Sequence, residues 1–194
     1  MIDAMSDENI ESNLDENPLP MQGDAPLKEP GFNLYAPSDF NARAWGFMRA
    51  ADILADHVLA DYRGADLVIY PIAYLYRHQL ELSVKEIIRR GNELADKPVK
   101  LKFTHPLGDL WKDCRTILEQ IGLSIDAPET EYFEASLKQF NEHDPNSTLF
   151  RYPLSPKFES LDIENLRTVM HRMSTFLEII RDEIEQRADV FNQS

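Results

Sequence analysis

Apolar residues recur at helical spacing in three long segments of the chain. Over residues 40–62, 107–121 and 162–184 they return every three or four positions, with polar residues between them. This period is typical of an amphipathic helix that buries one face. The pattern therefore predicts three long helices. Ser38 is placed to cap the first of them, and Gly64 follows its end.

The segment from Asp66 to Gly91 has a different pattern. It reads LVIYPIAYLYRHQLELSVKEIIRRG after Asp66, and its apolar residues surround the helix axis instead of lining one face. A helix that is apolar nearly all round is a buried one. We expect Asp66 to cap this helix, Pro71 to fall in its first turn, and Gly91 to end it. The segment is thus predicted to be the central element of the core.

Prolines divide the rest of the chain. Thr104-His105-Pro106 precedes the helix of 107–121, and Pro128 is placed to open a further helix, in which Phe133, Leu137 and Phe140 face inward. The stretch 143–161 contains three prolines and is expected to be non-helical. With no alternating strand pattern, the sequence predicts an all-α helical bundle of about five helices.

The N-terminal segment has a composition unlike the remainder. Residues 1–30 hold eight acidic side chains against one lysine, a net charge of −7 out of −14 for the whole chain. Acidic, proline-containing segments with few aliphatic residues bury too little surface to offset the entropy of ordering. We therefore expect residues 1–36 to be a disordered acidic arm that a protein partner can order, and residues 37–194 to be the helical bundle domain.

Several classes of protein are disfavoured by what the sequence lacks. The single cysteine, Cys114, falls on an apolar helix face and predicts an inert buried thiol. No apolar run approaches the roughly 20 residues of a membrane span, and no signal-peptide pattern is present, so a cytoplasmic protein without a membrane partner is expected. Since no glycine-rich phosphate loop and no Cys/His zinc spacing occur, we expect neither a cofactor nor a metal ion.

A row of charged residues lies on the predicted central helix. Arg77, Glu81 and Lys85 stand at i, i+4 and i+8 and so share one face, and His78 borders them. On an exposed helix such a row contributes little, but ionised groups in a core are costly unless they are paired. The row is therefore predicted either to neutralise itself, to pair with a neighbouring element, or to line a cleft.

The best candidate for that neighbouring element is the segment 143–153, HDPNSTLFRYP, which combines turn-forming residues with many hydrogen-bonding side chains. In a structural interpretation, Asp144 pairs with Arg77 or Lys85, and Arg151 pairs with Glu81. In a functional interpretation, the same groups surround a phosphate or a scissile bond. The substrate-binding candidates under that interpretation are His105, Asp144, Ser147 and Tyr152. Both interpretations remain open from the sequence.

Four strings in the chain resemble a family of bacterial helical proteins: YRHQLELSVKEII, FTHPLGDLWKDC, HDPNSTLFRYP and DIENLRTVMHRM. The resemblance extends over most of residues 50–180. That family is similar to the HEPN superfamily (higher eukaryotes and prokaryotes nucleotide-binding), whose members are short helical bundles. The HEPN signature is an arginine and a following histidine with four to six residues between them. The nearest match here is Arg167 and His171, which have three residues between them.

The resemblance implies a function. HEPN domains are commonly dimeric. Many of them are metal-independent ribonucleases that act in toxin–antitoxin and antiphage systems. On that basis the expected chemistry is transesterification of RNA, in which a histidine takes the proton of a 2′-hydroxyl and cations stabilise charge on phosphorus. His78 is the expected base, with Glu81 as the orienting carboxylate. The expected stabilising cations are Arg77, Lys85 and Arg151. Arg167 and His171 form a reserve pair.

Two other functions fit the same residues. The chain is alternatively a non-catalytic interaction subunit of a defence complex that uses its acidic arm, or a subunit that senses a nucleotide or small anion through Arg77, Lys85 and Arg151. The expected partners are a second copy of the chain or another protein, with RNA as a possible ligand.

Overall fold

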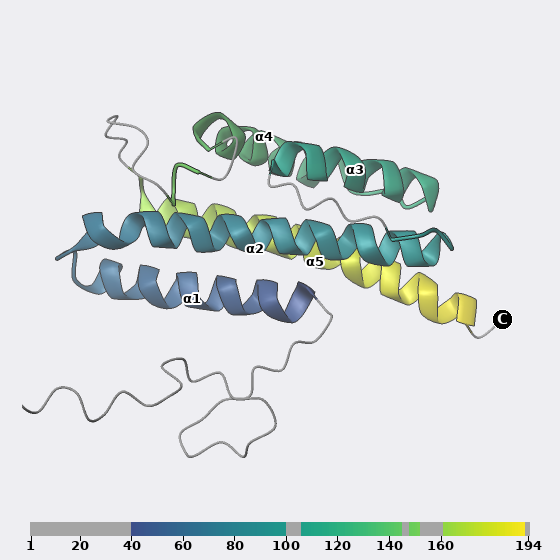
Figure 1. The fold of residues 1–194 in the computed structure, drawn as a ribbon, viewed down its shortest axis with the longest axis horizontal. Coiled ribbons are helices and arrows are strands. Elements are labelled where there is room, and N and C mark those ends of the chain that lie inside the picture. The colour runs from purple at the N-terminus through teal and green to yellow at the C-terminus, as the bar shows by residue number, and fades with distance from the viewer. Residues whose placement is uncertain (1–39, 100–105, 145–147, 152–160, 193–194) are drawn as a thin grey trace, which may run out of the picture. The chain divides into compact units, whose positions relative to one another are not determined.

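The computed structural model describes residues 40–99, 106–144, 148–151 and 161–192, and within these ranges it contains five helices (Figure 1). The helices are α1 (Phe40–Ala60), α2 (Ala65–Leu94), α3 (Leu107–Gln120), α4 (Ala127–His143) and α5 (Ile163–Asn192). The prediction of an all-α bundle of about five helices is therefore confirmed. The proposed arm of residues 1–36 and the capping residue Ser38 lie outside the described residues.

The central helix of the bundle is α2. Helices α1, α3 and α5 all pack against it, and half of its 30 residues are buried. Helix α1 runs antiparallel to α2, so that Asp52 meets Tyr76 while Phe47, earlier in α1, meets His78, later in α2 (Figure 1). The prediction that this apolar segment forms the core element is confirmed.

Helix α5 runs parallel to α2. Gln79 Nε2 donates to Ser174 Oγ over 2.8 Å, and further along both helices Arg90 Nη1 lies 2.8 Å from Glu185 Oε1. The two pairs advance together along the two helices, as parallel neighbours require. The expected inward positions of α5 from Leu166 to Ile184 are buried, with Val169 partly so.

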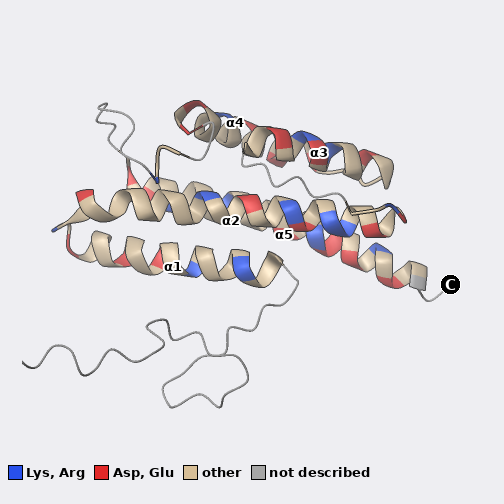
Figure 2. Cartoon of the chain, in the orientation of Figure 1, with Lys and Arg blue, Asp and Glu red and all other residues tan. Residues whose placement is uncertain are grey.

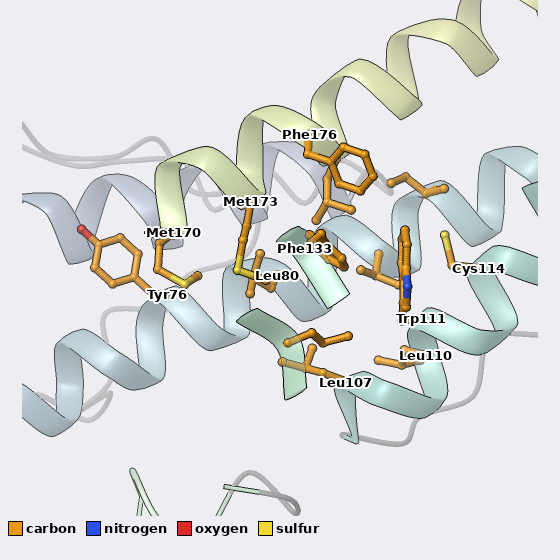
Figure 3. Packing of buried hydrophobic residues seen from close by; sticks show 14 of the residues in the cluster. Tyr76, Leu80, Leu107, Leu110, Trp111, Cys114, Phe133, Met170, Met173 and Phe176 are labelled. Atoms are coloured by element: carbon orange, nitrogen blue, oxygen red, sulfur yellow. The ribbon is translucent and has the colours of Figure 1, made fainter. Parts of the chain in front are cut away.

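An aromatic cluster joins the other helices. Trp111 of α3 and Phe133 of α4 have ring centroids 4.6 Å apart, and Phe176 of α5 lies 5.2 Å from Phe133 (Figure 3). Such tilted pairs contribute about 0.5–1.5 kcal/mol beyond their buried area. Cys114 lies fully buried near this cluster, and burial raises the pKa of its thiol, which agrees with the inert cysteine expected from the sequence.

The ends of α2 differ from the prediction. The cap is Gly64, whose φ of 77° lies in the left-handed region that glycine tolerates, so that Asp66 falls inside the first turn. Its carboxylate there complements the positive end of the helix dipole. Because the helix begins at Ala65, Pro71 lies in the second turn and not in the first.

The prediction that Gly91 ends α2 is wrong. The helix continues to Leu94, and Gly91 is buried where α2 crosses α3. A β-carbon at Gly91 would overlap Cγ2 of Ile117. The residue is therefore glycine because the two helices approach closely, and not because the helix stops there.

Replacement of Gly91 by alanine is expected to lower the free energy of unfolding by about 1–3 kcal/mol, the usual cost of overpacking. The matched control is Gly46→Ala in α1, where no atom stands within 4 Å of the new β-carbon. That change is expected to stabilise by roughly 0.5–1 kcal/mol, because alanine is the better helix former. Urea unfolding of both variants measures the difference, and equal stabilities would contradict the close α2–α3 packing.

Candidate functional site

The charged row predicted on the central helix lies in the interior of the protein. Helix α2 carries no Lys, Arg, Asp or Glu between Asp66 and Arg77, and its charged residues then follow in close succession (Figure 2). Arg77, Glu81 and Lys85 are only 1%, 2% and 6% exposed, and Asp144, at the end of α4, is 1% exposed. We call these four residues the α2 polar cluster.

Glu81 is at the centre of the α2 polar cluster. Its Oε1 accepts a hydrogen bond of 2.7 Å from Lys85 Nζ, and its Oε2 lies 3.7 Å from Arg77 Nη1. Two cations and two carboxylates thus offset one another, as a buried group of charges requires. Burial lowers the pKa of Arg77 from its ordinary value, while the carboxylates of Asp144 and Glu81 act in the opposite direction.

Asp144 connects the cluster to the segment that follows α4. Its Oδ1 accepts hydrogen bonds from the main-chain N–H groups of Thr148 and Leu149, at 2.6 and 3.0 Å. Its Oδ2 lies 3.6 Å from Arg77 Nε, and its main-chain oxygen accepts from Arg77 Nη2 at 3.5 Å. One aspartate therefore fixes both the turn at 148–151 and the position of that turn on α2. This is the Arg77–Asp144 pairing of the structural interpretation.

His78 stands at the edge of the cluster and is reached by solvent. Its side chain is 24% exposed, against 1% and 2% for Arg77 and Glu81. The ring packs edge-on against Phe47 with centroids 4.5 Å apart, and it stacks on Tyr74 at 5.7 Å. Its Nδ1 faces Glu81 Oε2 over 3.9 Å. The imidazole is thus held in one orientation, with one nitrogen toward a buried carboxylate.

Arg151 belongs to the same region. Its side chain is exposed, and its guanidinium carbon lies 5.8 Å from the centroid of the Tyr74 ring, within the range of a cation–π contact. Tyr74 therefore links Arg151 to His78. The structure brings together every described residue that the sequence singled out on α2 and in the segment that follows α4. His105, Ser147 and Tyr152, the other substrate-binding candidates, lie outside the described residues.

The burial of these residues separates two possible roles. Arg77, Glu81, Lys85 and Asp144 are too deeply buried to touch a ligand in this conformation, so they can act only by holding other groups in position. His78 and Arg151 face solvent and can contact a ligand directly. The catalytic roles expected for these residues stay predictions.

The reserve pair, Arg167 and His171, lies elsewhere, between α5 and α1. His171 Nε2 is 2.9 Å from Asp52 Oδ1, and Arg167 Nη1 is 2.5 Å from Asp56 Oδ1. Tyr76 of α2 donates its hydroxyl proton to the same Asp52 oxygen over 2.7 Å. Asp52 therefore ties three helices together. Burial, together with the hydrogen bond to the Asp52 carboxylate, raises the pKa of Tyr76.

Sequence reasoning missed Asp52 and Tyr76. One signal was available for Asp52, because this aspartate falls in the apolar phase of α1, between the fully buried Ala51 and Ala55. A carboxylate in that phase requires partners. Which partners it finds depends on the packing of α2 and α5 against α1, and the sequence pattern does not contain that information.

Comparison with known proteins yields no relative: no family model, no curated protein and no solved structure matches the chain. The resemblance to the HEPN superfamily therefore stays a prediction, and the class that the described residues define is an all-α bundle of five helices. Within the described ranges, no helix is both long and apolar enough to cross a membrane. The same part of the chain holds no group of three or more His, Cys, Asp or Glu side chains arranged for a metal ion.

Proposed function

We propose that the chain is an endoribonuclease that cleaves RNA by transesterification, with His78 as the general base. The observation that carries the proposal is the exposure and orientation of the His78 side chain. It is open to solvent, held between Phe47 and Tyr74, and directed by its Nδ1 toward Glu81. A positioned histidine with one nitrogen toward a carboxylate and the other directed away is the arrangement that general base catalysis uses.

In this reaction, His78 removes the proton of a ribose 2′-hydroxyl, and the 2′-oxygen then attacks the adjacent phosphorus. The bond from phosphorus to the 5′-oxygen of the next nucleotide breaks, and the proton held by His78 passes to that oxygen. The products are a 2′,3′-cyclic phosphate and a 5′-hydroxyl. Arg151, the exposed cation beside Tyr74, is placed to stabilise negative charge on the phosphoryl oxygens.

The buried residues have a supporting role in this proposal. Lys85 and Arg77 flank the Glu81 carboxylate, and Glu81 in turn favours one ring orientation of His78. Asp144 holds the turn that carries Arg151. An enzyme of this kind is suited to a cytoplasmic toxin or antiphage effector, the setting that the HEPN resemblance implies. A homodimer is part of the same proposal.

A second candidate function is a non-catalytic subunit that senses a nucleotide or small anion. It is favoured by the internal neutralisation of the α2 polar cluster, since a set of charges that cancel can be purely structural. In that case Arg151 and His78 bind an anion without breaking a bond. The ribonuclease cleaves RNA, whereas the sensing subunit leaves RNA intact.

Incubation of the full chain with a mixed-sequence RNA in the presence of EDTA tests the proposal. Cleavage is expected, and the same sequence carrying 2′-O-methyl groups is expected to stay intact, because it lacks the attacking hydroxyl. Intact RNA together with an increase in melting temperature on adding nucleotides would support the sensing subunit instead. Equal cleavage of both substrates would exclude the proposed reaction.

A further inference from the structure

A hollow of about 170 Å³ lies between α1 and α5, away from His78. Trp45, Arg49 and Asp52 line it from α1, and His171, Thr175 and Glu178 line it from α5. The α1 residues recur at i, i+4 and i+7, so they share one face of the helix. Phe47, which contacts His78, projects from a different face. The hollow is thus a site separate from the α2 polar cluster.

The hollow contains charges of both signs that do not pair with one another. Arg49 and Glu178 both line it, and among the described residues neither forms a hydrogen bond or a close ion pair, although the Glu178 carboxylate acts on Arg181 one turn further along α5. Asp52, at the inner side, shares its Oδ1 between Tyr76 and His171. A hydrogen-bond donor on α1, Arg49, and an acceptor on α5, Glu178, therefore line the same small hollow.

This combination of charges restricts the ligand. A free phosphate would face the carboxylates of Asp52 and Glu178, and a simple ammonium ion would face the guanidinium of Arg49. A ligand that suits the hollow presents donors and acceptors together. The indole of Trp45, 68% exposed, adds a flat apolar wall of the kind on which nucleic-acid bases stack.

We propose that this hollow binds a guanine base. Guanine carries two adjacent donors, N1–H and the N2 amino group, which one carboxylate can accept together, and its O6 and N7 are the acceptors that arginine prefers. Glu178 accepts from N1 and N2, Arg49 donates to O6 or N7, and Trp45 stacks on the ring. Adenine lacks the pair of adjacent donors, and pyrimidines offer less stacking surface. The proposal does not depend on RNA cleavage at His78.

Calorimetric titration of the full chain with GMP, IMP and AMP tests this inference. GMP is expected to bind, IMP to bind more weakly because it lacks the N2 amino group, and AMP to bind about 10- to 100-fold more weakly than GMP. Equal affinities for GMP and AMP would overturn the proposal. The proposal would also be overturned if GMP did not bind. Binding of a free amino acid such as glycine, which also presents donors and acceptors together, in place of GMP would overturn it as well.

Variants on the exposed surface locate the site. Glu178→Gln is expected to weaken GMP binding about 10- to 100-fold, since the new amide group opposes the donors of the base. Trp45→Ala is expected to weaken all the nucleotides. Glu164→Gln, an exposed glutamate on α5 outside the hollow, is the control and is expected to bind GMP as the natural chain does. Unchanged GMP binding by Glu178→Gln would overturn the assignment.

Discussion

Arg77→Met is expected to lower the free energy of unfolding by about 3–5 kcal/mol, the usual cost of removing one partner from a buried ion pair. Arg77 is 1% exposed and faces two carboxylates, at 3.7 Å from Glu81 and 3.6 Å from Asp144. Without its guanidinium, the buried carboxylate of Asp144 loses the cation beside it, and Lys85 contacts the other carboxylate, that of Glu81. Urea unfolding measures the loss.

The matched control for this variant is Lys138→Met on α4. Lys138 and Glu142 form an ion pair with the same i, i+4 spacing and a similar distance, 3.8 Å, but both side chains are exposed. Its removal is expected to change the stability by no more than about 0.5 kcal/mol. Since the two pairs differ mainly in burial, equal losses would show that burial of the Arg77 pair has no energetic consequence.

A double variant sharpens the test. Asp144→Asn removes the carboxylate that Arg77→Met leaves uncompensated, so the double variant is expected to be more stable than the sum of the two single losses predicts. Additive losses would mean that Arg77 and Asp144 do not interact. Asp144→Asn alone also keeps an oxygen able to accept from Thr148 and Leu149, so the turn at 148–151 should be retained.

The second large effect concerns His78. His78→Phe is expected to lower the rate of RNA cleavage by about 10²- to 10⁴-fold, the contribution typical of a positioned general base. Phenylalanine keeps an aromatic ring between Phe47 and Tyr74 but has no nitrogen to take a proton. The thermal stability is therefore expected to change little. Cleavage is measured at a temperature at which both proteins are folded.

His57→Phe provides the comparison for His78→Phe. His57 is an exposed histidine at the end of α1 and has no contact with the α2 polar cluster among the described interactions. The same substitution there is expected to leave the cleavage rate unchanged. If His78→Phe cleaves RNA as fast as His57→Phe, then His78 is not the base. A strong loss of stability in His78→Phe would instead mark His78 as a structural member of the cluster.

Most of the fold could be predicted from the sequence because it depends on local periodicity. The apolar spacing of 40–62 and 107–121 placed two helices close to their observed bounds, and that of 162–184 placed the start of α5, which continues to Asn192. Gly91 shows the limit of this reasoning. Glycine often follows a helix end, but here its lack of a side chain serves a helix crossing with Ile117, which lies on a different helix.

Less of the candidate site could be predicted. The spacing of Arg77, Glu81 and Lys85 indicated one charged row. The turn-forming and hydrogen-bonding residues of the segment 143–153 indicated that this segment lies beside the row. The differing exposure of adjacent residues could not be read from the sequence: Arg77 is 1% exposed while His78 is 24% exposed. That difference depends on how α1 and the end of α4 cover α2, and it decides which residue can meet a ligand.

In the proposed reaction, the 2′-hydroxyl of the substrate attacks its own strand, with His78 as the base. Its most direct test uses DNA strands that each contain a single ribonucleotide, A, C, G or U, with the products identified by mass spectrometry. A break is expected only after the ribonucleotide, in at least one of the strands, and it leaves a 2′,3′-cyclic phosphate and a 5′-hydroxyl. Breaks between deoxynucleotides, or four uncut strands, would contradict it.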